Sequence, residues 1–504
     1  MKVYLAGYNV DSSVLQELQE KGGHRDDVTP EVLSAAYARI SRDPRPINEI
    51  RKDARSEVNR ARKSNSSIIF KMGHHSVAEH AIFNLDILEI SRLAMEEVEK
   101  FRLCSYTEKS QRYVTLDRDF VIPQEIKNTP TEKQFTALIH EQNEAYTRLF
   151  DSLKEYVFKK NSALAADPKN HSLLEGWAKE DARYITSLAT QSQVGLTINA
   201  RNLELMLRRF ASSELAEVRD LGKTIHAQIA EIAPSIVLFY EANDRDRYTY
   251  PELRATIKST QTTCVHKPLY HEAKEVSLVE YSKDGDIRVA ASLLHSVTNL
   301  SYLECKRIIK KMSPKKLQTL FKAACKHMQF YDSMLREFEY AHLTFEIILS
   351  AACFGQLKRH RMSTITAQSY EPQLGVTIPL SIKEVGMEKY FKEIIKKTNR
   401  TYDAIRKKIP QTAAYILTNA HRRRVLMRIN ARELYHISRL REDSHAQWDI
   451  RAVSKAMSLQ AKTVMPYTFA LAAGKDAYNE AYKNLFGTLP KITQAVLPSA
   501  RKIK

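Results

Sequence analysis

The chain has 504 residues, with 78 Lys or Arg against 59 Asp or Glu, so its formal net charge is +19. A hydrophobic fraction of 43% and a charged fraction of 27% are typical of a globular protein and exclude a disordered, low-complexity or collagen-like chain. The length predicts two or more domains, and the positive charge favours polyanionic partners, either nucleic acid or small molecules rich in phosphate and carboxylate.

Neither end nor middle of the chain suggests a membrane or secreted protein. The best membrane-helix candidate, Leu343 to Gly355, is shorter than the roughly 18 apolar residues required, and it contains Glu346. The N-terminus has no long apolar segment and does not resemble a signal peptide. The cysteines lack C-x-x-C spacing, which predicts reduced thiols and no metal site. We therefore expect a cytoplasmic protein with no membrane partner. The cysteines are Cys104, Cys264, Cys305, Cys325 and Cys353.

Four segments of the first half recur in the same order in the second half. They are residues 35–41 with 290–296, 79–83 with 339–345, 101–107 with 360–366, and 198–201 with 429–432. Ordered recurrence predicts two copies of one domain. The distance from the third to the fourth segment is longer in the first copy, which predicts extra residues in the helix-prone stretch Asn128 to Lys179.

Each copy is predicted to begin with a strand and to continue mainly as helix. Strand-like alternation opens the copies at residues 3–5 and 276–279, and Leu203, Met206, Leu207 and Phe210 form an amphipathic helical stripe. We expect a helix-rich α+β fold with a first domain at 1–245, a linker at 246–273 and a second domain at 274–504. The linker region lacks a sustained helical period and contains Pro251.

A basic triplet in the second copy is suited to ligand binding. Arg359, His360 and Arg361 form a dense cluster of donors that fits a phosphate or a flavin ring edge, although such a triplet also fits a solvated surface. The triplet is followed by Thr364, Thr366, Ser369 and Glu371. Its first-copy counterpart is Lys100-Phe101-Arg102, followed by Ser105, Thr107, Ser110 and Arg112.

This spacing resembles the signature R-H-R-x-x-S-x-N-x-x-S-x-R of flavin-dependent thymidylate synthases. The chain is similar to two such domains fused in tandem, with the signature eroded differently in each copy. Further family-like segments are residues 73–80, 110–113, 430–432 and 445–448.

The resemblance implies an enzyme that converts dUMP to dTMP. Methylenetetrahydrofolate would donate the carbon, FAD reduced by NADPH would supply the hydride, and no covalent nucleophile would be needed. The family is tetrameric, so the resemblance implies a homodimer of this fused chain, which would be a pseudo-tetramer.

The resemblance also assigns residues. Arg441 would be catalytic, because its charge would stabilise the uracil ring as negative charge develops. The dUMP-binding residues would be Gln356, Arg359, Glu108, Ser110, Gln111, Arg112 and Arg183. The FAD-binding residues would be His74, Ser76, Glu79, Arg359, His360, Arg361, Asn430, Arg432, Asn199 and Arg201.

The losses in the two copies are complementary. Arg441 aligns with Phe210, Gln356 with Glu97, and Arg183 with Ala414. We therefore expect the second copy to supply the flavin-facing and activating half of each site, and the first copy the half that holds the phosphate. The reciprocal combination would be vestigial, since Glu371 there would repel a phosphate dianion.

Plainer explanations remain open for several of these residues. Ser76 to Glu79 and Asn430 to Glu433 both fit helix capping boxes, and His445 and Trp448 fit packing positions. A catalytically degenerate homologue that still binds flavin or nucleotide is one alternative function. A basic nucleic-acid-binding protein is another, although only Arg422–Arg424 and Arg501–Lys504 are dense basic runs, and no nucleic-acid motif accompanies them.

Overall fold

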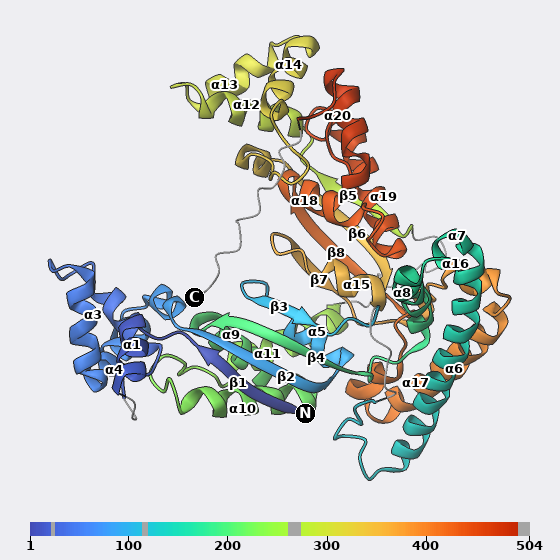
Figure 1. Ribbon diagram of the computed structural model, residues 1–504, viewed down its shortest axis with the longest axis horizontal. Coiled ribbons are helices and arrows are strands. Elements are labelled where there is room, and N and C mark those ends of the chain that lie inside the picture. Colours follow the sequence, from blue (N-terminus) through green and yellow to red (C-terminus); the bar gives the residue numbers. More distant parts are fainter. Residues whose placement is uncertain (22–25, 113–118, 261–273, 492–504) are drawn as a thin grey trace. The chain divides into compact units, whose positions relative to one another are not determined.

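The computed structural model describes residues 1–21, 26–112, 119–260 and 274–491 (Figure 1). The chain divides into two compact units. The first unit contains Met1–Pro268 together with Thr377–Ala420, and the second contains Leu269–Val376 together with His421–Lys504. The four described cysteines are buried and not bonded to one another, while Cys264 and the basic run 501–504 lie outside the described residues. Among the described helices, none is long and apolar enough to cross a membrane.

Each unit is built on a four-stranded antiparallel sheet, and the two sheets have the same topology. The strand orders are β1-β2-β4-β3 and β5-β6-β8-β7. The strands are β1 Lys2–Tyr8, β2 Ile82–Ser91, β3 Ser105–Glu108, β4 Gln191–Asn199, β5 Val276–Tyr281, β6 His342–Ser350, β7 Thr364–Ala367 and β8 Arg422–Asn430. The predicted opening strands and the helix-rich α+β class are confirmed.

The registers of the two sheets match the repeat found in the sequence. Ile82 pairs with Asn199 in the first sheet, and His342 pairs with Asn430 in the second. Likewise, Ser105 pairs with Thr197, and Thr364 pairs with Arg428. Because these pairs join the recurring segments in the same register, the chain is a tandem repeat in structure as well as in sequence.

Helices cover the sheet in each unit and bury its apolar side. In the first unit, Leu203, Met206, Leu207 and Phe210 are all buried and pack with the core residues of β2 and β4, which confirms the predicted stripe. In the first unit the helices are α1 Ser12–Lys21, α2 Glu31–Arg39, α3 Ile47–Ser56, α4 Val58–Ser66, α5 Arg92–Val98, α9 Ala200–Ala211, α10 Ala216–Ala230 and α11 Asp244–Thr260. The second unit contains α12 Gly285–Ser296, α13 Tyr302–Lys310, α14 Pro314–Cys325, α15 Ala351–Leu357, α18 Ala431–Arg441, α19 Trp448–Val464 and α20 Tyr478–Phe486.

The segments between the third and fourth strands of both copies lie in the first unit. The first copy contributes α6 Pro130–Lys160, α7 Ser162–Ala165 and α8 His171–Ala182, and the second contributes α16 Leu380–Glu384 and α17 Glu388–Lys408. Helices α6 and α17 pack side by side through their apolar faces (Figure 1). The extra residues predicted for the first copy thus form a longer α6 together with α7 and α8.

A pseudo-symmetric pairing joins the two copies inside the first unit. The Leu188 amide donates to the Leu417 carbonyl at 2.7 Å, and the Asn419 amide donates to the Thr186 carbonyl at 2.9 Å. Two further bonds of 2.9 Å, from Ala189 to Tyr415 and from Ala420 to Tyr184, obey the same symmetry. Residues 184–189 and 415–420 are therefore equivalent partners. The sequence division into 1–245, 246–273 and 274–504 stays a prediction about the copies, whereas the packing places residues 377–420 with the first copy.

The expectation of a region without helix after the first copy is wrong for residues 244–260, which form α11. Its first turn is fixed by polar contacts rather than by an apolar stripe. The Asp246 amide donates to Asn243 Oδ1 at 3.0 Å, and the buried Asp246 carboxylate pairs with Arg208 and Arg209 at 2.7 and 2.8 Å. Pro251 lies inside this helix. These contacts with another helix leave no periodic signal in the local sequence.

Candidate functional site

In the second unit, the end of α15 brings the Arg-His-Arg triplet to the end of α18. His360 is buried, and its Nε2 accepts a hydrogen bond of 3.1 Å from Arg441 Nε. Arg441 Nη2 also donates to the Gln356 carbonyl at 3.3 Å. A ring nitrogen that accepts carries no proton, so this contact assigns the proton of neutral His360 to Nδ1. The structure therefore brings together His360, Arg441 and Gln356, as the sequence predicts.

A buried glutamate completes this cluster from the same helix as Arg441. The Nδ1 atom of His360 lies 3.4 Å from Glu433 Oε1. Burial raises the pKa of Glu433 above its ordinary value, while burial lowers the pKa of the neighbouring His436. Arg441 thus bonds one side of the His360 ring, while the Glu433 carboxylate lies near the other side without a hydrogen bond from the ring to Oε1.

Gln447 is a member of the cluster that the residue-level reasoning missed. The Gln356 side chain donates to Gln447 Oε1 at 3.3 Å, and the same oxygen caps α19 by accepting from the Ile450 amide at 3.4 Å. Gln447 is fully buried. Gln447 belongs to the family-like segment 445–448, so the sequence contained a signal that could have identified it. The packing interpretation of His445 is wrong, because its side chain is 84% exposed and bonds Asp443.

The first copy replaces this polar cluster by an aromatic contact. Phe101 and Phe210, the counterparts of His360 and Arg441, lie with ring centroids 5.9 Å apart in an edge-to-face arrangement. Phe210 is buried in the core of the first unit, and Phe101 packs against that core. The position that holds a guanidinium in the second copy is therefore filled by hydrocarbon in the first.

In the first unit, α8 and the loop after β3 gather the residues expected to hold a phosphate. Arg183 is buried, and its Nε donates to the Glu180 carbonyl at 3.3 Å. The Arg112 guanidinium forms an ion pair with the Glu180 carboxylate. Burial lowers the pKa of Arg183, and the nearby cations Arg112 and Arg92 lower it further. An anion near the buried Arg183 would stabilise its charge, because burial is the main cause of its lowered pKa.

Two buried donors in this group have no hydrogen-bond partner among the described residues. They are Nη2 of Arg183 and Nε2 of Gln111. Gln111 and Arg183 are 7% and 8% exposed, so their unbonded N–H groups would be costly unless a ligand accepts from them. Phosphate oxygens are suitable acceptors for both groups.

The remaining predicted residues of this half lie along the same loop. Ser110 Oγ accepts from the Arg112 amide at 3.2 Å, and Glu108 accepts from Ser192 at 3.3 Å. Buried Arg92 lies 4.0 Å from Glu108. Arg92 and Glu180 were not predicted, although the spacing of Glu180 from Arg183 is that of neighbours on a helix surface.

The second copy does not preserve the phosphate-holding residues. Tyr370, the counterpart of Gln111, is buried, and the Arg423 guanidinium lies 4.3 Å from its ring centroid. The Glu371 side chain accepts from the Gln373 amide and caps a short helix, Pro372–Leu374. Ala414 stands where the first copy has Arg183. Among the described residues, the full set of residues expected to hold a phosphate therefore occurs in the first copy and not in the second.

Residues 26–235 and residues 277–467 each match the family described as thymidylate synthase complementing protein. The chain belongs to this family. The two matches confirm two tandem copies. A UPF0159 protein of Chlamydia pneumoniae is 24% identical over 80% of this chain and 79% of its own length. Flavin-dependent thymidylate synthases of Clostridium tetani and Sulfolobus acidocaldarius are 29% and 32% identical, over 41% and 39% of this chain and 80% and 76% of their own lengths.

Among solved structures, the UMP/dUMP methylase PolB from Streptomyces cacaoi bound with 5-Br dUMP resembles 47% of this chain and 92% of its own, with a TM-score of 0.33 and 17% identity.

Some of the residues expected from the sequence to bind flavin form similar pairs in both copies. Arg201 forms an ion pair of 2.5 Å with Glu79, and Arg432 forms one of 3.2 Å with Glu339. His74, Ser76, Glu79 and Arg201 are exposed in the first unit. In the second copy the counterparts of the first three are Met334, Arg336 and Glu339. Arg359, whose Nε donates to the Gly355 carbonyl at 3.0 Å, and Arg361 are also exposed.

The capping interpretation is confirmed for the Asn430 side chain, whereas it is wrong for Ser76, and Asn199 forms a cap that was not predicted. Asn199 and Asn430 stand at the N-caps of α9 and α18, and each accepts a backbone N–H, at 2.9 and 2.8 Å. Ser76 lies inside a short 3₁₀ helix, His75–His80, whose N-cap is His74 and which has no side-chain cap. The exposed Ser76 hydroxyl, the His74 ring and the Arg201 guanidinium are donors that fit a flavin cofactor with its diphosphate.

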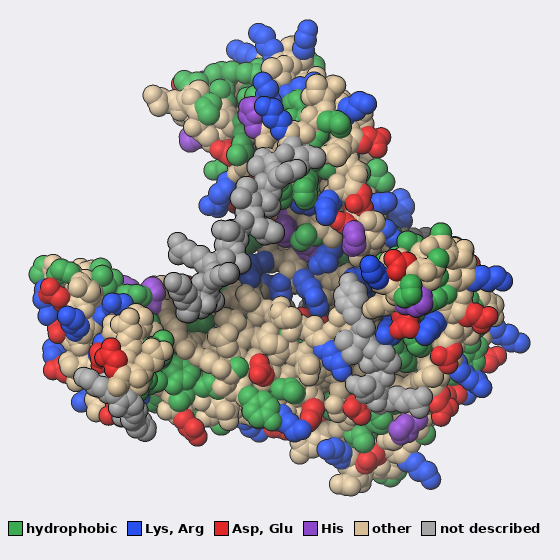
Figure 2. All heavy atoms as spheres, in the orientation of Figure 1, with side chains coloured by type: hydrophobic (Ala, Val, Ile, Leu, Met, Phe, Trp, Pro, Cys, Tyr) green, Lys and Arg blue, Asp and Glu red, His purple; other side chains and the backbone are tan. Residues whose placement is uncertain are grey.

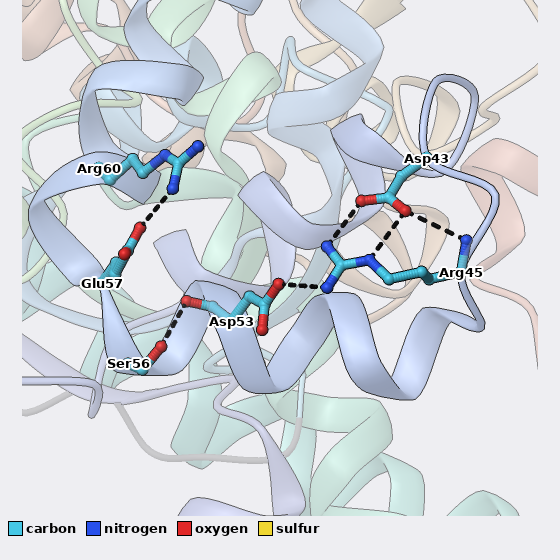
Figure 3. A network of polar contacts seen from close by, with 6 residues as sticks. All are labelled: Asp43, Arg45, Asp53, Ser56, Glu57 and Arg60. Carbon is cyan, nitrogen blue, oxygen red and sulfur yellow. Dashed lines mark hydrogen bonds and ion pairs between the residues drawn. The ribbon is translucent and has the colours of Figure 1, made fainter.

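In two other basic regions of this family member, several arginines are already paired with carboxylates. A polar hollow of about 620 Å³ near α3 and α4 contains Arg45 bonded to Asp43 and Asp53, and Arg60 bonded to Glu57 (Figure 3). Hydrogen bonds from Arg45 lower the pKa of the Asp43 carboxyl to about 2.

The basic run of β8 is matched in the same way. Arg422 pairs with Glu275 at 2.8 Å, Arg424 pairs with Glu346 at 2.5 Å, and Arg423 stacks on aromatic rings. Elsewhere, as over α6 and α8, Lys and Arg side chains are interspersed with Asp and Glu (Figure 2). Among the described residues, no group of three or more His, Cys, Asp or Glu side chains could hold a metal ion.

Proposed function

We propose that the chain is a flavin-dependent thymidylate synthase that methylates dUMP to dTMP. The named relatives of single-copy length, flavin-dependent thymidylate synthases, support the reaction class. When bound, FAD reduced by NADPH supplies the hydride, and methylenetetrahydrofolate supplies the carbon. The observation that carries the proposal is the complementary state of the two copies. The second keeps the His360–Arg441 pair, and the first keeps the Arg183 group with its unbonded donors.

Each retained residue has a role that its surroundings support. Arg441 is held by His360 and by the Gln356 carbonyl, so its guanidinium is oriented before substrate binds. It stabilises the negative charge that develops on the uracil ring, which is an electrostatic role favoured by such preorganisation. Arg183 and Arg112 hold the phosphate, since charge-assisted hydrogen bonds are the strongest available to them.

We infer that one working site uses residues of both copies and that the chain acts as a homodimer, which is a pseudo-tetramer of copies. The Arg441 counterpart is Phe210 and the Arg183 counterpart is Ala414. A reciprocal site would lack both the activating and the phosphate-holding guanidinium, so one nucleotide per chain is expected. We also propose that the reaction takes place in the cytoplasm.

The decisive test is a dUMP methylation assay with FAD, NADPH and methylenetetrahydrofolate, with Arg441→Ala beside the wild type. We expect dTMP from the wild type and a loss of roughly 10²–10³-fold in kcat for the variant, the range measured when one preorganised donor is removed. Arg439→Ala is the matched control, because this arginine lies on the same helix. Absence of dTMP from a wild-type protein that binds flavin would contradict the proposal and favour the degenerate homologue.

A further inference from the structure

A buried amide from the second copy lies among the phosphate-holding residues of the first. Asn419 follows η7, the short helix Pro410–Ile416, and is 1% exposed. Its Nδ2 donates to Gln111 Oε1 at 3.2 Å, to the Arg183 carbonyl at 3.1 Å and to Thr186 Oγ1 at 3.0 Å. One side chain therefore contacts both residues whose donors have no partner.

The contact with the Arg183 carbonyl fixes the orientation of the two amides. A carbonyl can only accept, so the Asn419 atom that faces it must be Nδ2. The Gln111 atom that faces the same Nδ2 must then be its oxygen. Consequently the Gln111 NH₂ group points away from Asn419, and this is the group that has no partner among the described residues. Without Asn419, either orientation of the Gln111 amide would be open.

Asn419 occurs on one side of the pseudo-symmetric pairing only. Its counterpart in the first copy is Leu188, which forms the equivalent backbone bond but has no polar side chain. Leu188 pairs with the second-copy segment that follows Ala414, and Ala414 is the counterpart of Arg183. The polar residue thus accompanies the copy that keeps the phosphate residues, and the apolar residue accompanies the copy that lost them.

We propose that Asn419 is a positioning residue for the nucleotide phosphate. It holds the Gln111 amide and the Arg183 backbone so that Gln111 Nε2 and Arg183 Nη2 both present N–H groups to one anion. This inference rests on the proposed function, because it takes the anion to be the phosphate of dUMP. It adds that the phosphate half of the site needs a residue from the second copy, which the first copy does not contain.

The test compares Asn419→Leu with the wild type by calorimetric titration of the full chain with dUMP and with deoxyuridine, which lacks the phosphate. We expect dUMP to bind about 10–100-fold more weakly to the variant, the usual effect of losing hydrogen bonds to a charged group. Deoxyuridine should bind both proteins equally. In the assay, KM for dUMP should rise while kcat at saturating dUMP stays within a factor of about two.

Gln142→Leu is the matched control. Gln142 is also a buried amide that joins α6 to the second-copy segment, with Nε2 donating to Thr398 Oγ1 at 2.9 Å and to the Ile416 carbonyl at 3.0 Å. Among the described residues, the Gln142 side chain forms no hydrogen bond with Gln111 or Arg183. Its loss should lower stability to a similar degree and leave dUMP binding unchanged.

A double-mutant cycle separates positioning from general destabilisation. Because Asn419 acts partly through Gln111 and partly through the Arg183 backbone, Gln111→Leu combined with Asn419→Leu should weaken dUMP binding by less than the two single changes would together if they were independent. Additive losses, or equal effects of Asn419→Leu and Gln142→Leu, would overturn the inference while leaving the proposed function intact. Failure of the wild type to bind dUMP more tightly than deoxyuridine would overturn both.

Discussion

In the second copy, His360 accepts a hydrogen bond from Arg441. The counterparts of these two residues in the first copy, Phe101 and Phe210, contact one another through their rings. Each pair is consistent in itself, since His360 and Arg441 satisfy one another by a hydrogen bond and Phe101 and Phe210 by an edge contact. A mixed pair would leave a buried charge without a partner. The two pairs therefore represent alternative states of one position, one polar and one apolar.

This reasoning predicts the effect of restoring only the arginine. Phe210→Arg should destabilise the first unit by about 3–5 kcal/mol, because a charge would enter an apolar core in which Phe210 is 2% exposed. Urea denaturation measures the loss. Phe239→Arg is the control, since Phe239 is 54% exposed and should tolerate the change. Equal midpoints for the two variants would show that the Phe101–Phe210 position is not part of the core.

The family resemblance pointed to several residues that the structure brings together, some within the linear signature and some far from it in sequence. His360, Arg441, Arg112 and Arg183 lie where their spacing implied. Asn419 could not be predicted, since its importance depends on a backbone pairing with a segment more than two hundred residues away. Glu180 and Arg92 were missed for a different reason, because burial beside other charges is not visible in a sequence.

Among elements, the contact between α10 and the second-copy segment depends on a half-buried carboxylate. Glu217, in the first turn of α10, accepts from the Ser91 amide and hydroxyl and from the Tyr415 hydroxyl, each at 2.7 Å. Burial raises the pKa of Glu217 above its ordinary value of 4.5 in spite of these donors. The folded protein therefore retains the proton of Glu217 at pH values where the unfolded chain has lost it.

The sign of the resulting pH dependence follows directly. Between pH 4.5 and the raised pKa of Glu217, the folded state binds more protons than the unfolded state, so stability falls as pH rises. Above the raised pKa the penalty is complete and constant. Glu217→Gln should remove this contribution to the slope, which denaturant titrations of both proteins at pH 4.5–8 would measure. Parallel pH profiles for the two proteins would contradict the assignment.

Elements whose apolar pattern is local could be predicted, and elements fixed by distant contacts could not. The stripe of α9 and the alternation of β1 appear in the sequence because each buries one face against the core of its own copy. Helix α11 starts at a polar cap and an ion pair with α9, so it has no comparable signature. The packing of α17 against α6 joins the two copies, and neither helix indicates its partner.

For the whole molecule, duplication allowed each copy to lose what the other retained. Arg441 and Arg183 occur in different copies, and their counterparts are Phe210 and Ala414, as the proposed composite site requires. The order and register of the repeats could be predicted from the sequence. The inclusion of residues 377–420 in the first unit could not, because it depends on packing between copies.

The number of dUMP molecules bound per chain tests this account most directly. Equilibrium dialysis of the purified chain with labelled dUMP, in the presence of FAD, should give one nucleotide per chain at saturation, and Arg183→Ala should abolish it. A stoichiometry of two per chain would contradict the account, because it would require a second site in which Ala414 and Glu371 hold a phosphate.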